Sequence, residues 1–460
     1  MNNARYIKHL YARAGFGIRF EDLHDHENWS IKKAVRKLFK ASEEIKPLTI
    51  LTENIDLHNN PHPTDEEKIR IQEDRNTQEK ALNLAWMTQL SITDAQLREK
   101  MTLFWHNHFA CNIGNAYYEQ QLNNIQRVNA LGNFKTMLLQ VSQSPAMLQF
   151  LNNQQNQKGH PNENFARELM ELFSIGRGNY TEQDIKESAR SFTGWSYDGK
   201  TGEYAFRPKV HDDGSKTFMG KTGDFCGEDI INIIFSNRQT AVFISTKLYR
   251  YLVNEVSDTA HINQMADVFY KSNYEITPLL EFVFLSDWFY EDKNIGNLIK
   301  SPVDFLTGLN RQFYITYQNP DVLMQFQRAL GQLLFRPPNV AGWPGGRSWI
   351  DSSSLMYRMK MPSIILNAGY IDFTGKADPG DEAYLAAVRK QQLNVIKRVQ
   401  AQPNWDKFLK EIPADTSKTQ IAEFMLEPKL NSAVIAEVNQ ATDMKTTIIQ
   451  IVSTPEYQLC

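Results

Sequence analysis

One short segment of the sequence brings together several side chains that can bind a cation or carry protons. His211 and Asp212 are adjacent there, and Lys216 follows a few residues later. Histidine and aspartate are common metal ligands, and binding sites often lie on loops that a rigid scaffold holds in place. Either both side chains face one cation or Asp212 orients His211. Against both roles, adjacent residues of an extended segment point in opposite directions. We therefore predict a divalent-metal role for His211 and Asp212, and a substrate-binding role for Lys216.

A second set of candidates is a dense group of charges on two expected helices, residues 162–176 and 182–194. Glu168 lies at the edge of an apolar stripe, where burial raises the pKa of a carboxyl group and suits it to acid or base catalysis. Arg167 and Arg190 supply cations that can hold a polar substrate. The simpler interpretation is a solvated face with pairs such as Arg167 and Glu171 at i,i+4. The catalytic interpretation requires these groups to converge on one pocket.

The two histidines of the segment WHNHF lie on one expected helix but on nearly opposite faces. His108 falls within the apolar stripe, where it is either a core histidine with one hydrogen bond or a general base that joins the catalytic candidates. His106 points away from that stripe and is expected at the surface or against a loop. The two rings therefore cannot bind one metal ion from a regular helix.

A loop rich in proline and glycine is expected at residues 335–350. It carries Trp343, Arg347 and Trp349, which can present aromatic faces and a guanidinium group to a ligand such as a sugar. We predict Trp343 and Arg347 as substrate-binding residues. In the alternative, Trp343 fills the core while the neighbouring glycines allow close backbone packing.

Apolar residues spaced three and four apart dominate the sequence and predict a mainly α protein. We expect a multi-helix bundle of orthogonal helices and αα-hairpins, with helices capped at Asn162 and Thr181 forming one such hairpin. A capping box is expected at residues 93–96. A small β-hairpin insertion is expected near residues 200–220, between segments 204–207 and 211–218. We predict a core domain over residues 1–370 and a helical C-terminal extension over 380–460, packed on that core.

Composition and charge exclude several classes of protein. The 460 residues carry a formal net charge of −3, without the clustered Lys and Arg that nucleic-acid binding requires. No window approaches the roughly 18 apolar residues of a membrane-spanning helix, and the N-terminus has no apolar leader region. The sequence as given predicts a soluble cytoplasmic protein, or a periplasmic one if a leader has been removed.

Several cofactor and metal classes also lack their usual signals. The sequence contains no phosphate-binding glycine loop and no nucleotide, haem or flavin motif. Its three cysteines, Cys111, Cys226 and Cys460, form no C-x-x-C pair, and no Glu-x-x-His pair supports a di-iron bundle. A divalent metal therefore remains the one cofactor that the sequence suggests.

Six segments taken together resemble a known bacterial family, DUF1800. They span nearly the whole chain in order: HLYARAGFG at 9–17, FWHNHF at 104–109, NENFARELMELFSIG at 162–176, YTEQDIKESARSFTGW at 180–195, HDDGSKTFMG at 211–220 and LFRPPNVAGWPGG at 334–346. The resemblance implies a large, mainly helical bacterial protein with no established activity. Relatives are often exported and often encoded beside a DUF1501 protein, which looks like a member of the alkaline-phosphatase or sulfatase superfamily. The resemblance thus suggests a DUF1501-type partner.

These observations give two functional hypotheses. The first is a hydrolase-like pocket that acts on a polar, saccharide-related substrate by acid/base or cation-assisted chemistry. In it, Glu168 is the acid or base, His108 and His211 are ligands or proton carriers, and Arg167 or Arg190 is the substrate clamp. The second is a non-catalytic accessory or assembly protein that binds a DUF1501-type partner. A carbohydrate-binding module is a third reading, which requires Trp343 and Trp349 to be exposed.

Overall fold

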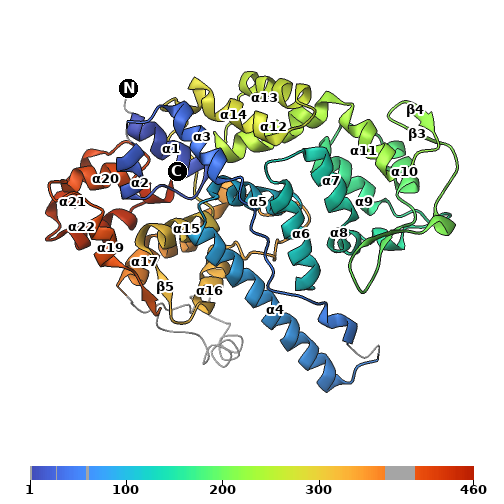
Figure 1. The fold of residues 1–460 in the computed structure, drawn as a ribbon, viewed down its shortest axis with the longest axis horizontal. Helices are drawn as coiled ribbons and strands as arrows, with labels where there is room; N and C mark the ends of the chain where they lie inside the picture. Colours follow the sequence, from blue (N-terminus) through green and yellow to red (C-terminus); the bar gives the residue numbers. More distant parts are fainter. Residues whose placement is uncertain (1–2, 27, 59–61, 368–398) are drawn as a thin grey trace. The chain divides into compact units, whose positions relative to one another are not determined.

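The computed structural model describes residues 3–26, 28–58, 62–367 and 399–460. It is mainly α-helical, with only small two-stranded sheets among the described residues, which confirms the predicted fold class. The chain forms two compact units (Figure 1). Unit 1 comprises residues 1–16, 28–294 and 334–344, and unit 2 comprises residues 17–27, 295–333 and 345–460. The predicted boundary at 370–380 lies outside the described residues, so the division into a core domain and a C-terminal extension stays a prediction.

Unit 1 holds all the candidates except Arg347. Its helices pack largely as neighbours in sequence, such as the pairs α5–α6 and α12–α13. The helices are α1 (Asn3–Ala14), α3 (Ile31–Ala41), α4 (Asp65–Ile92), α5 (Gln96–His108), α6 (Ala116–Asn129), α7 (Phe134–Gln143), α8 (Pro145–Phe150), α9 (Glu163–Glu168), α10 (Glu182–Ser191), α11 (Gly227–Phe235), α12 (Arg238–Leu252), α13 (Thr259–Lys271) and α14 (Ile276–Leu285), with 3-10 turns η1 (Ile55–His58), η2 (Asn153–Gln155), η4 (Pro208–Val210) and η5 (Asp287–Tyr290).

Unit 2 is a smaller helical unit that includes the end of the chain. A short antiparallel pair of strands, β5 (Thr316–Tyr317) and β6 (Ala401–Gln402), joins two of its distant segments. Its helices are α2 (Phe20–His26), α15 (Pro302–Phe313), α16 (Asp321–Leu330), α17 (Ser352–Leu366), α19 (Trp405–Lys410), α20 (Lys418–Met425), α21 (Ser432–Gln440) and α22 (Met444–Val452), with 3-10 turns η6 (Gly346–Trp349) and η7 (Glu456–Gln458).

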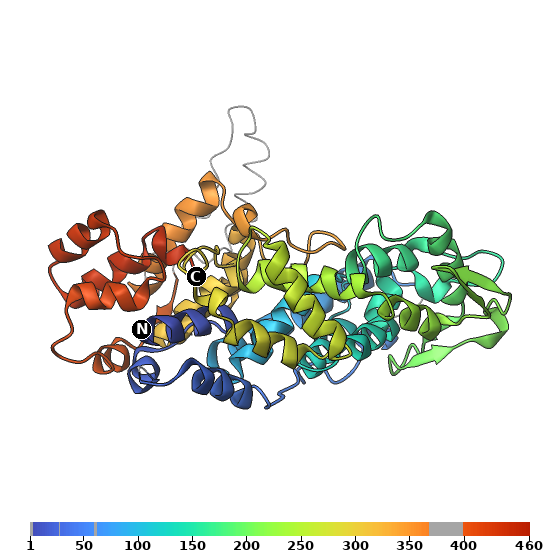
Figure 2. The same ribbon diagram turned by 90° about the horizontal axis from the view of Figure 1, so that it is seen from above.

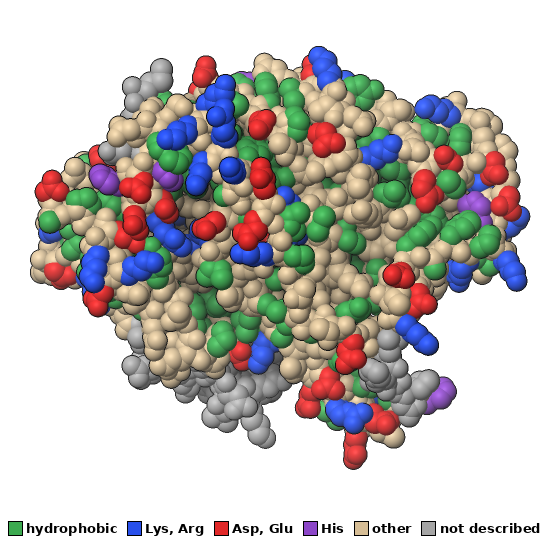
Figure 3. All heavy atoms as spheres, in the orientation of Figure 1, with side chains coloured by type: hydrophobic (Ala, Val, Ile, Leu, Met, Phe, Trp, Pro, Cys, Tyr) green, Lys and Arg blue, Asp and Glu red, His purple; other side chains and the backbone are tan. Residues whose placement is uncertain are grey.

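The first half of α4 extends away from the rest of unit 1 in Figure 1. The buried residues of this helix begin only at Glu79, and its first turn carries Asp65, Glu66 and Glu67. Acidic side chains accordingly gather at the free end of α4 in Figure 3. The second half of the helix packs against α6 and contributes to the core of the unit.

The predicted αα-hairpin is present, but its first helix changes its winding halfway. Asn162 caps α9, and Thr181 caps α10 in a capping box with Asp184, as the sequence predicts. After Glu168 the chain forms a π-helical turn, η3 (Leu169–Ser174), instead of continuing the α-helix. The turn ends at Gly176, whose φ of +80° suits glycine, and a Cβ there would lie 2.8 Å from the Phe243 ring. π-turns of this kind often occur at functional sites.

The region near residues 200–220 forms two hairpins, whereas the sequence suggested one. Strand β1 (Trp195–Tyr197) pairs with β2 (Tyr204–Phe206), and β3 (Lys216–Phe218) pairs with β4 (Lys221–Gly223). Both lie beside the α9–α11 region in the views of Figures 1 and 2. The predicted small β insertion is confirmed, but segments 204–207 and 211–218 do not pair with each other. Strand β2 pairs with the preceding β1, and β3 pairs with the following β4.

The predicted capping box at residues 93–96 was also wrong. Helix α5 begins at Gln96 and follows Ala95, which makes no side-chain cap. The Thr93 hydroxyl accepts a hydrogen bond from the Ala95 amide, and the Gln96 side chain accepts one from the Phe16 amide. A tertiary contact has therefore replaced the local one that the sequence pattern suggested.

Among the helices that the structure describes, none has the length and apolar character needed to cross a bilayer.

Candidate functional site

Two carboxylates lie on the π-helical turn of the αα-hairpin. Glu168 is the last residue of α9, and Glu171 lies within η3. Residues three apart on a helix are neighbours on its surface, and the two carboxyl groups influence each other electrostatically. Both side chains are half-buried. The turn thus places a carboxylate pair at a partly desolvated position.

Glu171 is held in its ionised form by two donors from the following loop. Its carboxylate accepts hydrogen bonds from Arg177 Nε at 2.9 Å and from the Tyr180 hydroxyl at 2.9 Å, and Arg177 Nη2 makes a further contact. Burial alone would raise the pKa of Glu171, but these hydrogen bonds together outweigh it and lower that pKa. Burial and the bond to Glu171 raise the pKa of Tyr180 to about 12, so Tyr180 remains a proton donor.

Glu168 has the opposite environment. Among the described residues its carboxyl group forms no hydrogen bond and no ion pair. Burial raises its pKa, and the negative charge of Glu171 adds to the shift, while Arg167 and Arg177 act against it. Two neighbouring carboxyl groups whose pKa values are pushed apart are the arrangement expected of an acid and a base.

Arg167 lies beside this pair but pairs with different partners from the one predicted. Its guanidinium donates to both oxygens of Glu182, at 3.0 and 2.9 Å, and to Glu163 at 3.3 Å. The suggested pair with Glu171 was wrong, because the π-turn displaces Glu171 toward Arg177. Arg167 therefore links α9 to the first turn of α10.

His108 lies beneath the π-turn, in contact with its carbonyl groups. Its Nε2 is 3.1 Å from the Phe173 carbonyl, which can only accept, so Nε2 carries the proton. Nδ1 then accepts a hydrogen bond from Lys247 Nζ at 3.1 Å. Burial and the charge of Lys247 keep the pKa of His108 well below its usual value, so the ring is neutral. The core position predicted for His108 is confirmed.

His106, on the opposite face of α5, was expected at the surface or against a loop, and the loop contact is the one observed. It is buried, and its Nε2 accepts a hydrogen bond from the Phe335 amide at 3.1 Å. Burial lowers its pKa to about 3. The face of α5 opposite to His108 is thus also covered, by the loop that begins at Leu334.

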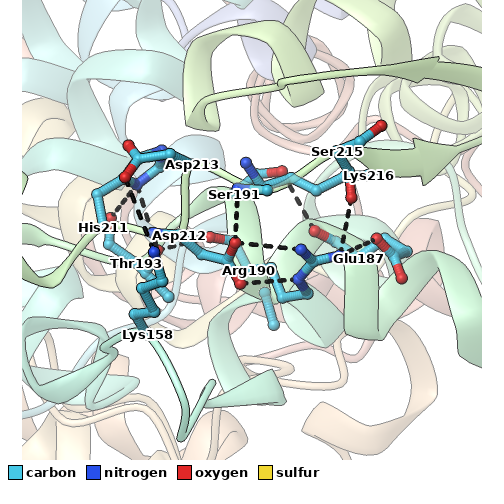
Figure 4. Close-up of polar contacts among 12 residues, drawn as sticks. Lys158, Glu187, Arg190, Ser191, Thr193, His211, Asp212, Asp213, Ser215 and Lys216 are labelled. Atoms are coloured by element: carbon cyan, nitrogen blue, oxygen red, sulfur yellow. Dashed lines mark hydrogen bonds and ion pairs between the residues drawn. The ribbon is translucent and has the colours of Figure 1, made fainter.

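Arg190, His211 and Asp212 form a separate cluster between α10 and the hairpins (Figure 4). Arg190 donates to both oxygens of Asp212, at 2.8 and 3.1 Å, and to Glu187 at 2.7 Å. The bonds from Arg190 lower the pKa of Asp212 to about 2. His211 donates from Nδ1 to the Thr193 carbonyl at 2.8 Å, which leaves Nε2 as its free ring nitrogen. Arg190 and Asp212 thus tie α10 to the loop before β3.

This cluster does not fit the predicted metal site. Both oxygens of Asp212 are already bonded to the Arg190 guanidinium, whose positive charge disfavours a cation at the same position. Within the described part of the chain, no three His, Cys, Asp or Glu side chains are arranged to hold a metal ion. Lys216 is buried and pairs with Asp224 at 3.0 Å, so it anchors β3.

The tryptophans of the 335–350 loop do not form a platform for a sugar. Trp343 is buried in unit 1, where its amide and carbonyl bond to the Asn107 side chain. A Cβ on Gly342 would lie 2.2 Å from that side chain, which explains the glycine. Trp349 is buried in unit 2, and Arg347 is exposed in the same turn. Burial of both indoles excludes the carbohydrate-binding module, and the core-filling alternative for Trp343 is the one observed.

Sequence reasoning missed a buried carboxylate, Glu119 on α6. It accepts hydrogen bonds from the amides of Ile113 and Gly114, and burial raises its pKa to about 8. Arg336 lies within electrostatic reach and is paired with Glu79 on α4. Glu119 therefore remains protonated at neutral pH and holds the loop between α5 and α6. Its sequence context, a helix rich in Gln and Asn, looks like a solvated face and gives no signal of burial.

The sequence analysis also did not identify Tyr180, Arg177 and Lys247 as candidates. For Tyr180 and Arg177, two glycines in the sequence could have indicated the position. Gly176 and Gly178 both adopt positive φ, so the chain turns back after η3 and returns the next side chains to Glu171.

The predicted site residues therefore do not converge on one place. Glu168 and Arg167 lie at the π-turn, and His108 lies beneath it. Arg190, His211, Asp212 and Lys216 lie at the hairpins, whereas Trp343 and Arg347 lie in the 335–350 loop.

Comparison with protein families gives one match that covers nearly the whole chain. A family model described as "Protein of unknown function (DUF1800)" matches residues 9–459. The chain therefore belongs to the DUF1800 family, as its six motifs suggested. No curated protein and no solved structure gave a match.

Proposed function

We propose that the protein is a hydrolase that uses the carboxylate pair Glu168 and Glu171 on a polar, saccharide-related substrate. The observation that carries the proposal is the unequal environment of two carboxyl groups within one helical turn. Glu171 accepts hydrogen bonds from Arg177 and Tyr180, whereas Glu168 has no hydrogen bond among the described residues, and their pKa values shift in opposite directions accordingly. Hydrolysis of a glycosidic bond requires one protonated and one ionised carboxyl group that act together.

Each residue of the pair then has a defined role. Glu168, with its raised pKa and no competing hydrogen bond, donates a proton to the oxygen that leaves as the glycosidic bond breaks. Glu171 acts as the negative partner, either by activating a water molecule or by stabilising the positive charge that develops on the sugar. Arg177 and Tyr180 keep Glu171 ionised and fix its orientation. Arg167, held by Glu163 and Glu182, is the cation at the edge of the pair.

The experiment that tests this proposal is a hydrolysis screen with a matched pair of variants. Wild-type protein is assayed with a panel of 4-nitrophenyl glycosides and with polysaccharides by release of reducing ends. In Glu168→Gln the proton donor is removed, and we expect the rate to fall by a factor of about 100 or more. Glu66→Gln is the control, because Glu66 is an exposed carboxylate of α4 outside the site; we expect it to retain most of the activity.

Equal rates for wild type and Glu168→Gln would contradict the assigned role. If the wild-type protein hydrolyses none of the substrates, the proposal fails. The accessory role predicted from the sequence, with a DUF1501-type partner, then becomes the hypothesis to test by pull-down.

A further inference from the structure

Lys247 on α12 makes two hydrogen bonds that define where its amine points. Nζ donates to the Leu172 carbonyl at 3.0 Å and to His108 Nδ1 at 3.1 Å. The Phe243 ring lies 4.9 Å from the same nitrogen. The side chain is partly exposed, as are those of Leu172 and Phe243. The amine is therefore fixed in position, in largely apolar surroundings that still reach the surface.

These contacts suit a neutral amine as well as an ammonium ion. A neutral lysine has two N–H groups and one lone pair. Both N–H groups would be used by Leu172 and His108, and the lone pair would point away from these two acceptors. The third N–H of an ammonium ion has no acceptor among the described residues, and no Asp or Glu lies there within ion-pair distance. The positive charge therefore has no carboxylate partner among the described residues, and its support comes from these two acceptors and the Phe243 ring.

The pKa of Lys247 is lowered, which also favours the neutral amine. Burial alone lowers its pKa to about 8. The titratable group that faces it is His108, which is neutral and fixed by the Phe173 carbonyl. At about pH 7, roughly one Lys247 side chain in ten carries a neutral amine, against about one in a few thousand for an ordinary lysine.

We propose that Lys247 is a nucleophilic amine site that takes small carbonyl compounds of the aldehyde class. Desolvated lysines are activated in this way in enzymes that form Schiff bases. The amine lone pair attacks the carbonyl carbon and a C–N bond forms, with the proton of the amine passing to the oxygen to give a carbinolamine. Loss of water then gives an imine, without any oxidant or reductant. This site does not depend on the proposed hydrolysis at Glu168 and Glu171.

Reductive trapping tests this inference on the full-length protein. Folded protein is incubated at about pH 7 with glycolaldehyde and sodium cyanoborohydride, and the modified lysines are identified over time by peptide mass spectrometry. We expect Lys247 to be modified at least about tenfold faster than the exposed Lys158 and Lys200. The rate at Lys247 should rise with pH and level off above about pH 8.

Two controls keep the test decisive. Lys247→Arg retains a donor for Leu172 and His108 but has no trappable amine, so the fast-labelling peptide should disappear while circular dichroism confirms the fold. In concentrated urea the protein unfolds and the surroundings of Lys247 are lost, so Lys247 should be labelled no faster than Lys158 and Lys200. Labelling of Lys247 no faster than that of Lys158 and Lys200 in the folded protein would overturn the proposal. Faster labelling of Lys247 that persists in urea would overturn the proposal as well.

Discussion

Replacement of Glu119 by glutamine is expected to stabilise the protein at alkaline pH by about 5 kcal/mol and to leave it nearly unchanged near pH 4.5. The pKa of Glu119 rises from 4.5 to about 8 on folding, mainly because the side chain is buried. A raised pKa means that the folded state holds the proton more tightly, so wild type loses stability as pH rises from about 4.5 to about 8. Glutamine remains neutral and can still accept from the Ile113 and Gly114 amides.

Thermal melts of both proteins between about pH 5 and pH 9 measure this difference. The melting temperature of Glu119→Gln should exceed that of wild type by an amount that grows with pH and levels off above about pH 8. Glu66→Gln, at an exposed position of α4, serves as the control and should run parallel to wild type at every pH. A difference between Glu119→Gln and wild type that stays constant with pH would show that Glu119 does not titrate as the structure indicates.

Removal of Arg127 is expected to destabilise the protein by about 3 to 5 kcal/mol. Arg127 and Glu99 are both buried and form two hydrogen bonds, at 2.6 and 3.1 Å. Glu99 also accepts from Trp86 at 2.8 Å, so it cannot turn toward solvent when its partner is lost. Arg127→Met fills similar space but leaves the Glu99 charge buried and uncompensated, which is the costly case for an internal ion pair.

Urea denaturation of Arg127→Met provides the measurement, with an exposed pair as reference. Arg238 and Asp267 are 2.6 Å apart, and their side chains are 41% and 50% exposed. Arg238→Met should therefore cost less than about 1 kcal/mol. The double variant Arg127→Met, Glu99→Leu should regain much of the lost stability, because no unpaired charge remains. Equal effects of Arg127→Met and Arg238→Met would contradict a buried, stabilising contact.

The helical class and several helix boundaries follow directly from the sequence. Asn162 and Thr181 both cap helices, because their side chains satisfy backbone amides within three residues. Such local chemistry does not depend on the rest of the fold. The box at residues 93–96 failed for the opposite reason, since Gln96 bonds to the distant Phe16 amide instead. Local sequence patterns cannot predict helix boundaries that depend on tertiary contacts.

The candidate site was only partly predictable. Glu168 could be found because its place at the edge of an apolar stripe indicates partial burial. The sequence predicted that Glu171 pairs with Arg167, because the two are four residues apart on a regular α-helix. The π-turn at Leu169–Ser174 changes that geometry. The 3.6-residue periodicity of apolar residues does not reveal such a turn, and it does not show that Lys247 and His108 bond to the Leu172 and Phe173 carbonyls within it.

His211 and Asp212 show why residue types alone do not define the partners of a side chain. Their residue types match a metal site, yet the fold brings Arg190 to the Asp212 carboxylate from a neighbouring helix. That guanidinium occupies the position of a cation, and the His211 ring is oriented by the Thr193 carbonyl. Only the tertiary structure reveals which counter-charge a carboxylate receives.

The most direct test of the proposed acid/base pair is a carboxyl NMR titration. Wild-type protein labelled with carbon-13 glutamate is titrated, and the signals of Glu168 and Glu171 are assigned by their loss in Glu168→Gln and Glu171→Gln. The account predicts that Glu168 titrates above 4.5 and Glu171 below it. The same midpoint for both, or the reverse order, would contradict the division of roles on which the proposed hydrolysis depends.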